Sequence, residues 1–151
     1  MSYCAKEYLG QVRLLDQRIT AKMEQIDRVR ALTQKITSTI DDISVSHSKN
    51  VTALQDQIVR LMEEKESLDR QVERLVNFKN EVQEVLELMD NSDYRLLLEL
   101  RYLCLESWEK IAGIFHYSPR TIYKKHVEAL QQLDEILKSE EFLRIHEKWT
   151  K

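Results

Sequence analysis

The sequence predicts an all-α protein, and three observations lead to that prediction. Gly and Pro are scarce, with 2 Gly and 1 Pro among 151 residues, while charged residues make up 32% of the chain. Such a composition favours long helices over sheets. Apolar residues recur at heptad spacing through most of the first 90 residues, and two helical patterns with capping residues follow after residue 106. We therefore expect a long, coiled-coil-like antiparallel helical hairpin followed by a three- to four-helix domain.

The first predicted helix has an apolar stripe that persists for about five heptads. Its a and d positions are Val12, Leu15, Ile19, Lys22, Ile26, Val29, Thr33, Ile36, Ile40 and Ile43. Lys22 and Thr33 interrupt the stripe, and Lys22 can lay its methylene groups along the seam while its charge reaches water. A polar, serine-rich segment at residues 44–50 then predicts a connection.

A second stripe predicts another long helix over residues 51–89. Its a positions are Val51, Ile58, Lys65, Val72, Lys79 and Leu86, and its d positions are Leu54, Leu61, Leu68, Leu75, Val82 and Met89. Two helices of nearly equal length, joined by a short polar loop, favour an antiparallel hairpin. The alternative is a parallel homodimer through residues 51–89, in which lysines at a positions would set the register and the oligomeric state.

The polar break at residues 90–93 divides the chain into a predicted stalk, residues 1–90, and a predicted C-terminal domain, residues 91–151. Asn91 or Ser92 can cap a helix that runs to about Leu105. A last helical segment, residues 139–149, has apolar residues spaced for docking on this domain or for covering a partner. Cys104 is expected to be a small core residue and Cys4 an exposed thiol.

Between these segments the spacing predicts two helices joined by a tight turn. Ser107 and Ser118 stand where N-cap oxygens would accept backbone N–H groups, and Pro119 follows at the first helical position. The inward residues of the two helices are Trp108, Ile111, Ala112, Phe115, Ile122, His126, Ala129, Leu130 and Leu133. This is a helix-turn-helix, an arrangement that presents its second helix, here about residues 118–137, to the major groove of DNA.

The stretch SWEKIAGIFHYSPRTIYKKHVEALQQL resembles the helix-turn-helix of region 4 of bacterial sigma factors. The matching positions are Ser107, Lys110–Ile111–Ala112, Ser118, Thr121–Ile122 and Ala129–Leu130. With the helical segment before it, the chain resembles small phage and prophage regulators whose C-terminal domain is similar to sigma region 4. The resemblance implies promoter DNA as a ligand and RNA polymerase as a partner. Phe115 and Tyr117 are bulkier than the family pattern in the turn, and the other sigma regions have no counterpart here.

Charge narrows the expected DNA contact to a short stretch. The net charge is −3, and residues 51–90 hold 5 Lys and Arg against 10 Asp and Glu. Residues 116–127 contain three cations and no acid. Six residues are expected on or near the outer face of the recognition helix: Ser118, Arg120, Thr121, Tyr123, Lys124 and Lys125. Arg120 suits guanine recognition, Thr121 or Tyr123 a thymine methyl or a phosphate, and the two lysines phosphates.

Other classes of function find little support in the sequence. The four histidines are scattered over a predicted loop, a turn and two helices, and with two glycines the chain has no Gly-rich phosphate loop, so we expect no enzyme, no catalytic residues and no cofactor. The two cysteines lack a metal-ligand spacing, so no metal site is expected. No signal peptide or membrane span is expected, which fits a reducing cytoplasm. The resemblance to phage regulators implies that this is the cytoplasm of a bacterial host cell.

Two functional hypotheses follow. In the first, the protein is a phage-encoded, sequence-specific transcriptional regulator that binds double-stranded DNA, and residues 5–89 dimerise it or contact RNA polymerase. In the second, the fold is kept without DNA binding, and the protein is an interaction module such as an anti-sigma-like or assembly adaptor. The acidic second helix is compatible with both hypotheses.

Overall fold

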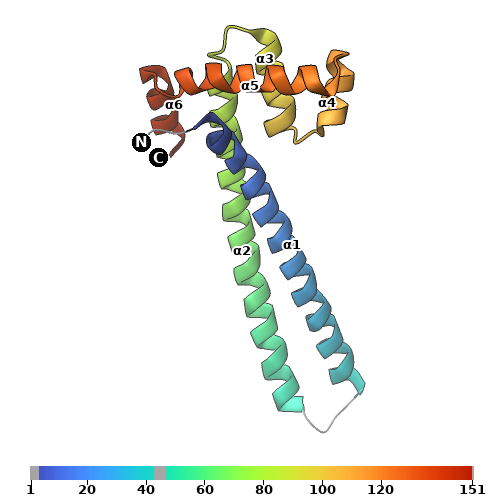
Figure 1. Ribbon diagram of the computed structural model, residues 1–151. Helices are drawn as coiled ribbons and strands as arrows, with labels where there is room; N and C mark the ends of the chain where they lie inside the picture. Colours follow the sequence, from blue (N-terminus) through green and yellow to red (C-terminus); the bar gives the residue numbers. More distant parts are fainter. Residues whose placement is uncertain (1–3, 43–46, 151) are drawn as a thin grey trace. The chain divides into compact units, whose positions relative to one another are not determined.

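The computed structural model describes residues 4–42 and 47–150, and the elements in these ranges are helices (Figure 1). They are α1 (Ala5–Asp42), α2 (His47–Leu86), α3 (Ser92–Leu98), the π-helical turn η1 (Glu99–Leu103), α4 (Trp108–Phe115), α5 (Pro119–Ile136) and α6 (Glu140–Thr150). The predicted all-α class and the long helical hairpin are confirmed. None of the described helices has the length and apolar character needed to cross a membrane.

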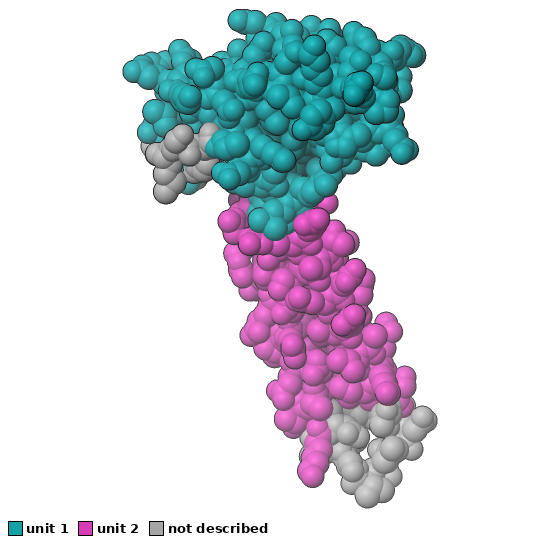
Figure 2. Space-filling model, in the orientation of Figure 1, with its two compact units in different colours: residues 1–15, 75–151 teal, residues 16–74 magenta. Residues whose placement is uncertain are grey.

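The chain forms two compact units (Figure 2). The head unit comprises residues 1–15 and 75–151, and the stalk unit comprises residues 16–74. The beginning of α1 and the end of α2 therefore belong with the C-terminal helices, whereas the sequence pattern placed the boundary at residue 90. The physical reason is the set of buried contacts, described below, that α1 and α2 make inside the head unit.

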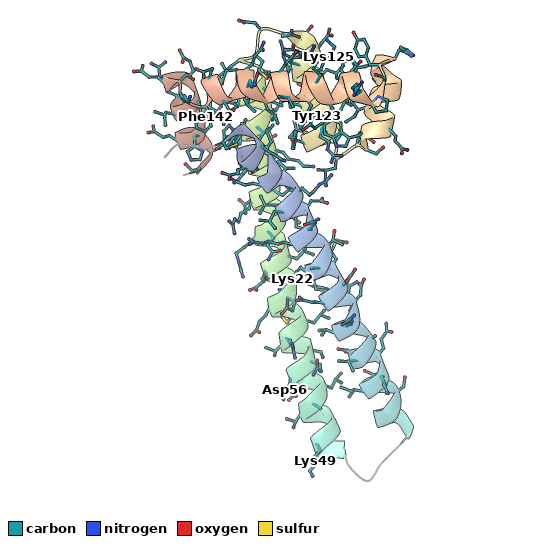
Figure 3. The ribbon with its side chains drawn as sticks, in the orientation of Figure 1. Lys22, Lys49, Asp56, Tyr123, Lys125 and Phe142 are labelled. Atoms are coloured by element: carbon teal, nitrogen blue, oxygen red, sulfur yellow. The ribbon has the colours of Figure 1, made fainter. Side chains whose placement is uncertain are left out.

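The stalk unit is an antiparallel pair of helices whose register is marked by an ion pair. Lys22 Nζ lies 2.7 Å from Glu64 Oε2, and both side chains are largely buried (Figure 3 labels Lys22). The predicted antiparallel hairpin is thus what α1 and α2 form. Residues 44–46 of the predicted connection, and the predicted seam residue Ile43, lie outside the described residues. Residues 47–50 are helical, because polar side chains are tolerated in a first turn whose N–H groups lack intrahelical partners.

The seam of the hairpin differs from the predicted heptads on one helix. On α1 the predicted positions from Val12 to Ile36 are buried or half-buried, and on α2 the leucines at positions 54, 61 and 68 are half-buried as well. The predicted a positions Ile58, Lys65 and Val72 are instead exposed, and the half-buried positions are Gln57, Glu64 and Gln71. The Glu64 ion pair favours this rotation of α2. Its cost is that the buried Oε1 atoms of Gln57 and Gln71 have no hydrogen-bond partner in the described residues.

In the head unit the C-terminal helices pack against the first turns of α1 and the last turns of α2. In Figure 1, α4 lies near one end of α5, α6 near the other, and α3 beside its middle. One cluster of its core brings together Leu97, Ile111, Ala112 and Ile122, with Leu100, Trp108 and Phe115 against it. Near α6, the ring of Tyr8 meets those of Phe78 and Phe142 edge-on, each at 5.4 Å between centroids. The last helix docks within the head unit, where Phe142 is buried, and its contact with Tyr8 is to α1 rather than to the predicted domain, residues 91–151.

A buried carboxylate connects three helices of this unit. Glu81 of α2 is 1% exposed. It accepts a hydrogen bond from the Tyr8 hydroxyl of α1, and its Oε1 lies 2.9 Å from Nδ1 of His146 on α6. The backbone N–H of Ala5 also donates to Asp134 of α5 at 2.7 Å. These polar contacts hold the first turns of α1 in the head unit.

One predicted core residue is wrong. Cys104 is exposed, as Cys4 is. The reason is η1: Cys104 N–H bonds to the carbonyl of Glu99, five residues back, so the helix is underwound there. The extra residue in the turn moves the side chains that follow away from the face that regular helical spacing assigns to them.

We predict that Tyr8→Phe lowers the free energy of unfolding by about 1–3 kcal/mol, because it removes a donor from a buried carboxylate. Urea unfolding followed by circular dichroism measures the effect. Tyr123→Phe is the matched control, since the Tyr123 side chain is 67% exposed and its loss of a hydroxyl should change little. Equal unfolding midpoints for Tyr8→Phe and the wild type would show that this hydrogen bond contributes nothing.

Candidate functional site

The segment from Ser107 to α5 has the local chemistry that fixes two helices around a tight turn. The Ser107 hydroxyl accepts from the N–H of Lys110, and the Ser118 hydroxyl accepts from the N–H of Thr121, both at 3.2 Å. Pro119 occupies the first turn of α5, as predicted. Between the caps, His116 takes a left-handed conformation with φ 58°, and the Tyr117 N–H reaches back to the carbonyl of Ala112 at 3.1 Å. This is the geometry in which a helix ends and the chain reverses.

The six predicted DNA-contacting residues divide into a central pair and two flanks. Ile122, His126, Ala129 and Leu133 form the buried face of α5. Arg120 and Lys124 are exposed and lie one helical turn apart on the opposite face. Gln131 continues this face, and it is also exposed. The central pair is therefore free to meet a ligand along the first two turns of α5.

The flanking residues differ in their exposure and in the contacts that they already make. Thr121 and Lys125 are half-buried on one side, where the Lys125 ammonium lies 5.3 Å from the centre of the Tyr117 ring. Ser118 is occupied as a cap, because its hydroxyl also donates to Thr121 Oγ1 at 3.0 Å. Tyr123 projects from the other flank (Figure 3). The structure therefore places Ser118 as a residue that orients α5, with its oxygen already engaged.

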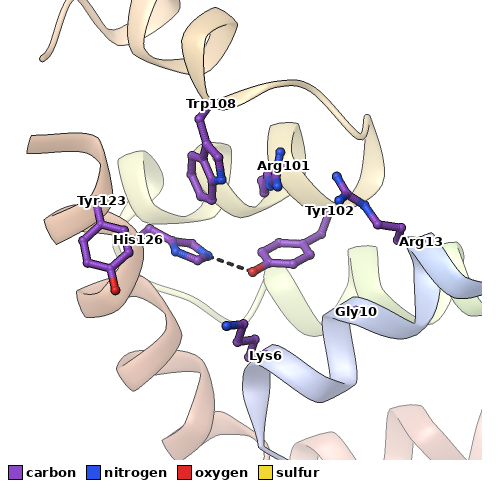
Figure 4. Close-up of a pocket in the computed structure, with 8 residues that line it drawn as sticks. All are labelled: Lys6, Gly10, Arg13, Arg101, Tyr102, Trp108, Tyr123 and His126. Carbon is purple, nitrogen blue, oxygen red and sulfur yellow. Dashed lines mark hydrogen bonds between the residues drawn. The ribbon is translucent and has the colours of Figure 1, made fainter. Parts of the chain in front are cut away.

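The flank with Tyr123 opens onto a cavity inside the head unit (Figure 4). Its volume is about 310 Å³, and α1, η1, α4 and α5 contribute side chains to it. The cations at the cavity are Lys6, Arg13 and Arg101, and its aromatic residues are Tyr102, Trp108, Tyr123 and His126. Gly10 completes the lining. This volume lies at the lower end of the range for small-molecule sites, about 300–1,000 Å³.

The backbone between α3 and α4 positions two of these side chains. Arg101 and Tyr102 lie in η1, and the chain then passes through Leu105, whose φ is 56°. A leucine in this left-handed region costs on the order of 1 kcal/mol or more. Arg101 Nη1 donates to the carbonyl of Glu106 at 2.9 Å, and its guanidinium lies 4.5 Å from the centre of the Trp108 ring. A π turn and a strained residue thus occur together at the wall of the cavity.

His126 lies at the back of the cavity and is neutral at physiological pH. Burial lowers the pKa of His126 to about 4, and the positive charges of Arg101 and Lys6 act in the same direction. Its Nε2 is 2.8 Å from the Tyr102 hydroxyl, and its ring meets Trp108 at 4.5 Å between centroids (Figure 4). The prediction that His126 is a packed, hydrogen-bonded residue is confirmed by these contacts.

The cavity is the part of the site that the sequence reasoning missed. Lys6, Gly10 and Arg13 are far in sequence from the helix-turn-helix, and no periodicity links them to it. A local signal was present: the three residues are spaced four and three apart, which places them on one face of a helix. That signal identifies a face, but it does not tell which helices the face meets.

The fold and this site define a class: an all-α protein in which two capped helices around a tight turn adjoin a cavity. Residues 35–134 match a family described as "Protein of unknown function", DUF1492. This span covers about two thirds of the chain, so the protein belongs to that family. Neither the curated proteins nor the solved structures gave a match.

We predict that His126 makes stability fall as the pH drops from about 6.5 to about 4. The unfolded histidine binds a proton near pH 6.5, whereas the folded one stays neutral down to about pH 4. The contribution of the neutral His126 to the free energy of unfolding is fully present above pH 6.5. It is lost as the pH falls toward 4, by up to about 3 kcal/mol. The measurement is urea unfolding of the wild type and of His126→Gln across this range.

The difference between the two curves isolates His126 from the other titrating groups. His116→Asn is the control, because His116 is exposed and asparagine tolerates its left-handed conformation. Parallel curves for the wild type and His126→Gln would contradict the assignment of a neutral, buried imidazole.

Proposed function

We propose that the protein is a sequence-specific DNA-binding transcriptional regulator of the phage type, with α5 as the recognition helix in the major groove. The observation that carries the proposal is the exposed pair Arg120 and Lys124 on the first two turns of a helix fixed by the Ser118 cap. The N-terminal turns of a recognition helix are the part that reaches base edges.

The charge and chemistry of the outer face support this assignment. Arg120 carries the planar donor fork that binds guanine through two hydrogen bonds, and Lys124 can hold a phosphate. Residues 116–127 contain no acidic side chain that would repel the DNA backbone. The resemblance to sigma region 4 adds a promoter element as the kind of DNA site and bacterial RNA polymerase as a partner.

The stalk supports a protein-contact role in the same proposal. Ile58, Val59 and Met62 on α2 are exposed apolar residues within a helix rich in acidic side chains. Three cations on one recognition helix give few phosphate contacts, so a single copy should bind DNA weakly. We infer that α1 and α2 supply either a second copy of the chain or a contact with RNA polymerase. An interaction module without DNA binding is the competing function, and the acidic α2 is compatible with both.

We predict that Arg120→Ala lowers affinity for the preferred DNA site by about 5- to 100-fold and relaxes specificity at one base pair. Lys124→Ala should weaken binding to all sequences and reduce the salt slope by about one. The preferred site is first selected from fragmented phage and host DNA. Fluorescence anisotropy at several salt concentrations then gives the affinities.

Arg144→Ala is the matched control, because it removes one exposed cation from α6 and should leave DNA binding unchanged. If no DNA is enriched in the selection, or if a variant lacking Arg120, Lys124 and Lys125 binds as the wild type does, α5 is not a recognition helix. The interaction-module function is then the one retained.

We further predict that the full chain forms a dimer at micromolar concentration, and that Val59→Glu/Met62→Glu shifts it toward monomer by placing two charges on the apolar patch of α2. Sedimentation equilibrium at several concentrations measures this shift. Arg60→Glu is the control for added acidic charge on the same helix, because Arg60 is exposed and lies off the face that carries Ile58 and Met62. A strict monomer at all concentrations would leave RNA polymerase as the partner of the stalk.

A further inference from the structure

We propose that the head-unit cavity binds a small planar aromatic anion, a ring that carries a phosphate or a carboxylate. The site is formed by Lys6 and Arg13 of α1, Arg101 and Tyr102 of η1, Trp108 of α4 and His126 of α5. This goes beyond DNA recognition, and it is tested without DNA.

The charge of the cavity favours the binding of an anion. Three cations line it, and none of its described lining residues is acidic. Within the described part of the chain none of these three cations has an ion pair. Burial lowers the pKa of Arg101, and the neighbouring charge of Arg13 lowers it further. Positive groups that repel one another around a part-buried space are stabilised when a negative group enters.

The aromatic side chains that line the cavity favour the binding of a planar ring. Trp108 and His126 meet at 65° between planes, and Tyr102 is stacked beside His126 with its hydroxyl directed to the imidazole (Figure 4). Aromatic faces and edges of this kind bind flat apolar rings favourably. Because His126 is neutral, it presents a ring and a hydrogen-bonding nitrogen without adding a fourth charge. Aromatic rings and cations line the same space, and these are the two kinds of group that an aromatic anion requires.

Gly10 keeps the space open. A glycine inside a helix lowers its stability by roughly 0.5–1 kcal/mol relative to alanine. A Cβ at Gly10 would meet no atom within 4 Å, so packing does not require glycine there. A larger side chain at this position would instead extend into the cavity. This makes Gly10 the position at which the cavity can be filled without removing any of its functional groups.

The test is isothermal titration of the full-length protein with four probes. They are 5′-AMP, adenosine, inorganic phosphate and 2-naphthoate. The proposal expects 5′-AMP or 2-naphthoate to bind at least tenfold more tightly than adenosine, which lacks the charge, and than inorganic phosphate, which lacks the ring. Comparing 5′-AMP with 2-naphthoate then distinguishes a phosphate from a carboxylate ligand.

Variants locate the binding in this cavity. Gly10→Leu should lower the affinity for the probe that binds by at least tenfold. Its thermal unfolding midpoint, followed by circular dichroism, should be equal to or above that of the wild type. Arg13→Gln should lower the affinity for the charged probe and leave the affinity for adenosine unchanged. Gly113→Leu is the matched control: a Cβ there also meets no atom within 4 Å, and the residue lies on the exposed face of α4.

Three results would overturn the proposal. The first is that neither aromatic anion binds at millimolar concentrations. The second is that inorganic phosphate binds as tightly as 5′-AMP, which would mean that the aromatic side chains of the cavity do not contribute to binding. The third is that Gly10→Leu and Gly113→Leu bind alike. If Lys6→Gln and Arg13→Gln weaken DNA binding while no probe binds, the cations serve the DNA backbone, and the small-molecule site is excluded.

Discussion

The head unit depends on the burial of one carboxylate. Glu81 is removed from water, and a buried charge is tolerated only when hydrogen-bonding groups replace the solvent. Its partners come from the first turns of α1, through Tyr8, and from α6, through His146. Two segments at opposite ends of the chain are thereby tied to the end of α2. Because α1 begins in this place, Lys6, Gly10 and Arg13 reach the cavity beside α5. The hydrogen bonds of this buried carboxylate thus contribute to bringing the residues of α1 to the cavity.

The helix α5 serves three purposes, and its faces separate them. Its buried face completes the core through Ile122, Ala129 and Leu133. Its outer face offers Arg120 and Lys124 to DNA in the proposed function. Its third face carries Tyr123 and His126 to the cavity. The caps at Ser107 and Ser118 and the left-handed His116 fix where this helix starts, so the three faces keep their relation to the rest of the head unit.

Local chemistry made much of the head unit predictable. Capping by Ser107 and Ser118, the turn between them, the inward position of His126 and the docking of the last helix all follow from spacing and side-chain type. The rotation of α2 was not predictable from its leucines, because the Lys22–Glu64 pair stabilises the seam only once the two helices face each other. Cys104 was misplaced since η1 adds a residue to one turn, and nothing in the heptad or helical period signals that insertion. The cavity required the pairing of residues about 90 positions apart, which no local pattern encodes.

The distribution of charge bears on how the proposed functions coexist. A chain of net charge −3 does not attract nucleic acid as a whole, so affinity for DNA has to come from the few cations on α5. The cations of the cavity are a second positive group in the same unit, and they are directed to a space lined with rings rather than along the outer face of α5. An anion held there would neutralise charge on the Tyr123 side of α5 without occupying Arg120 or Lys124. In the two proposals, the groups for base recognition are therefore separate from those for a small ligand, while one helix carries side chains of both.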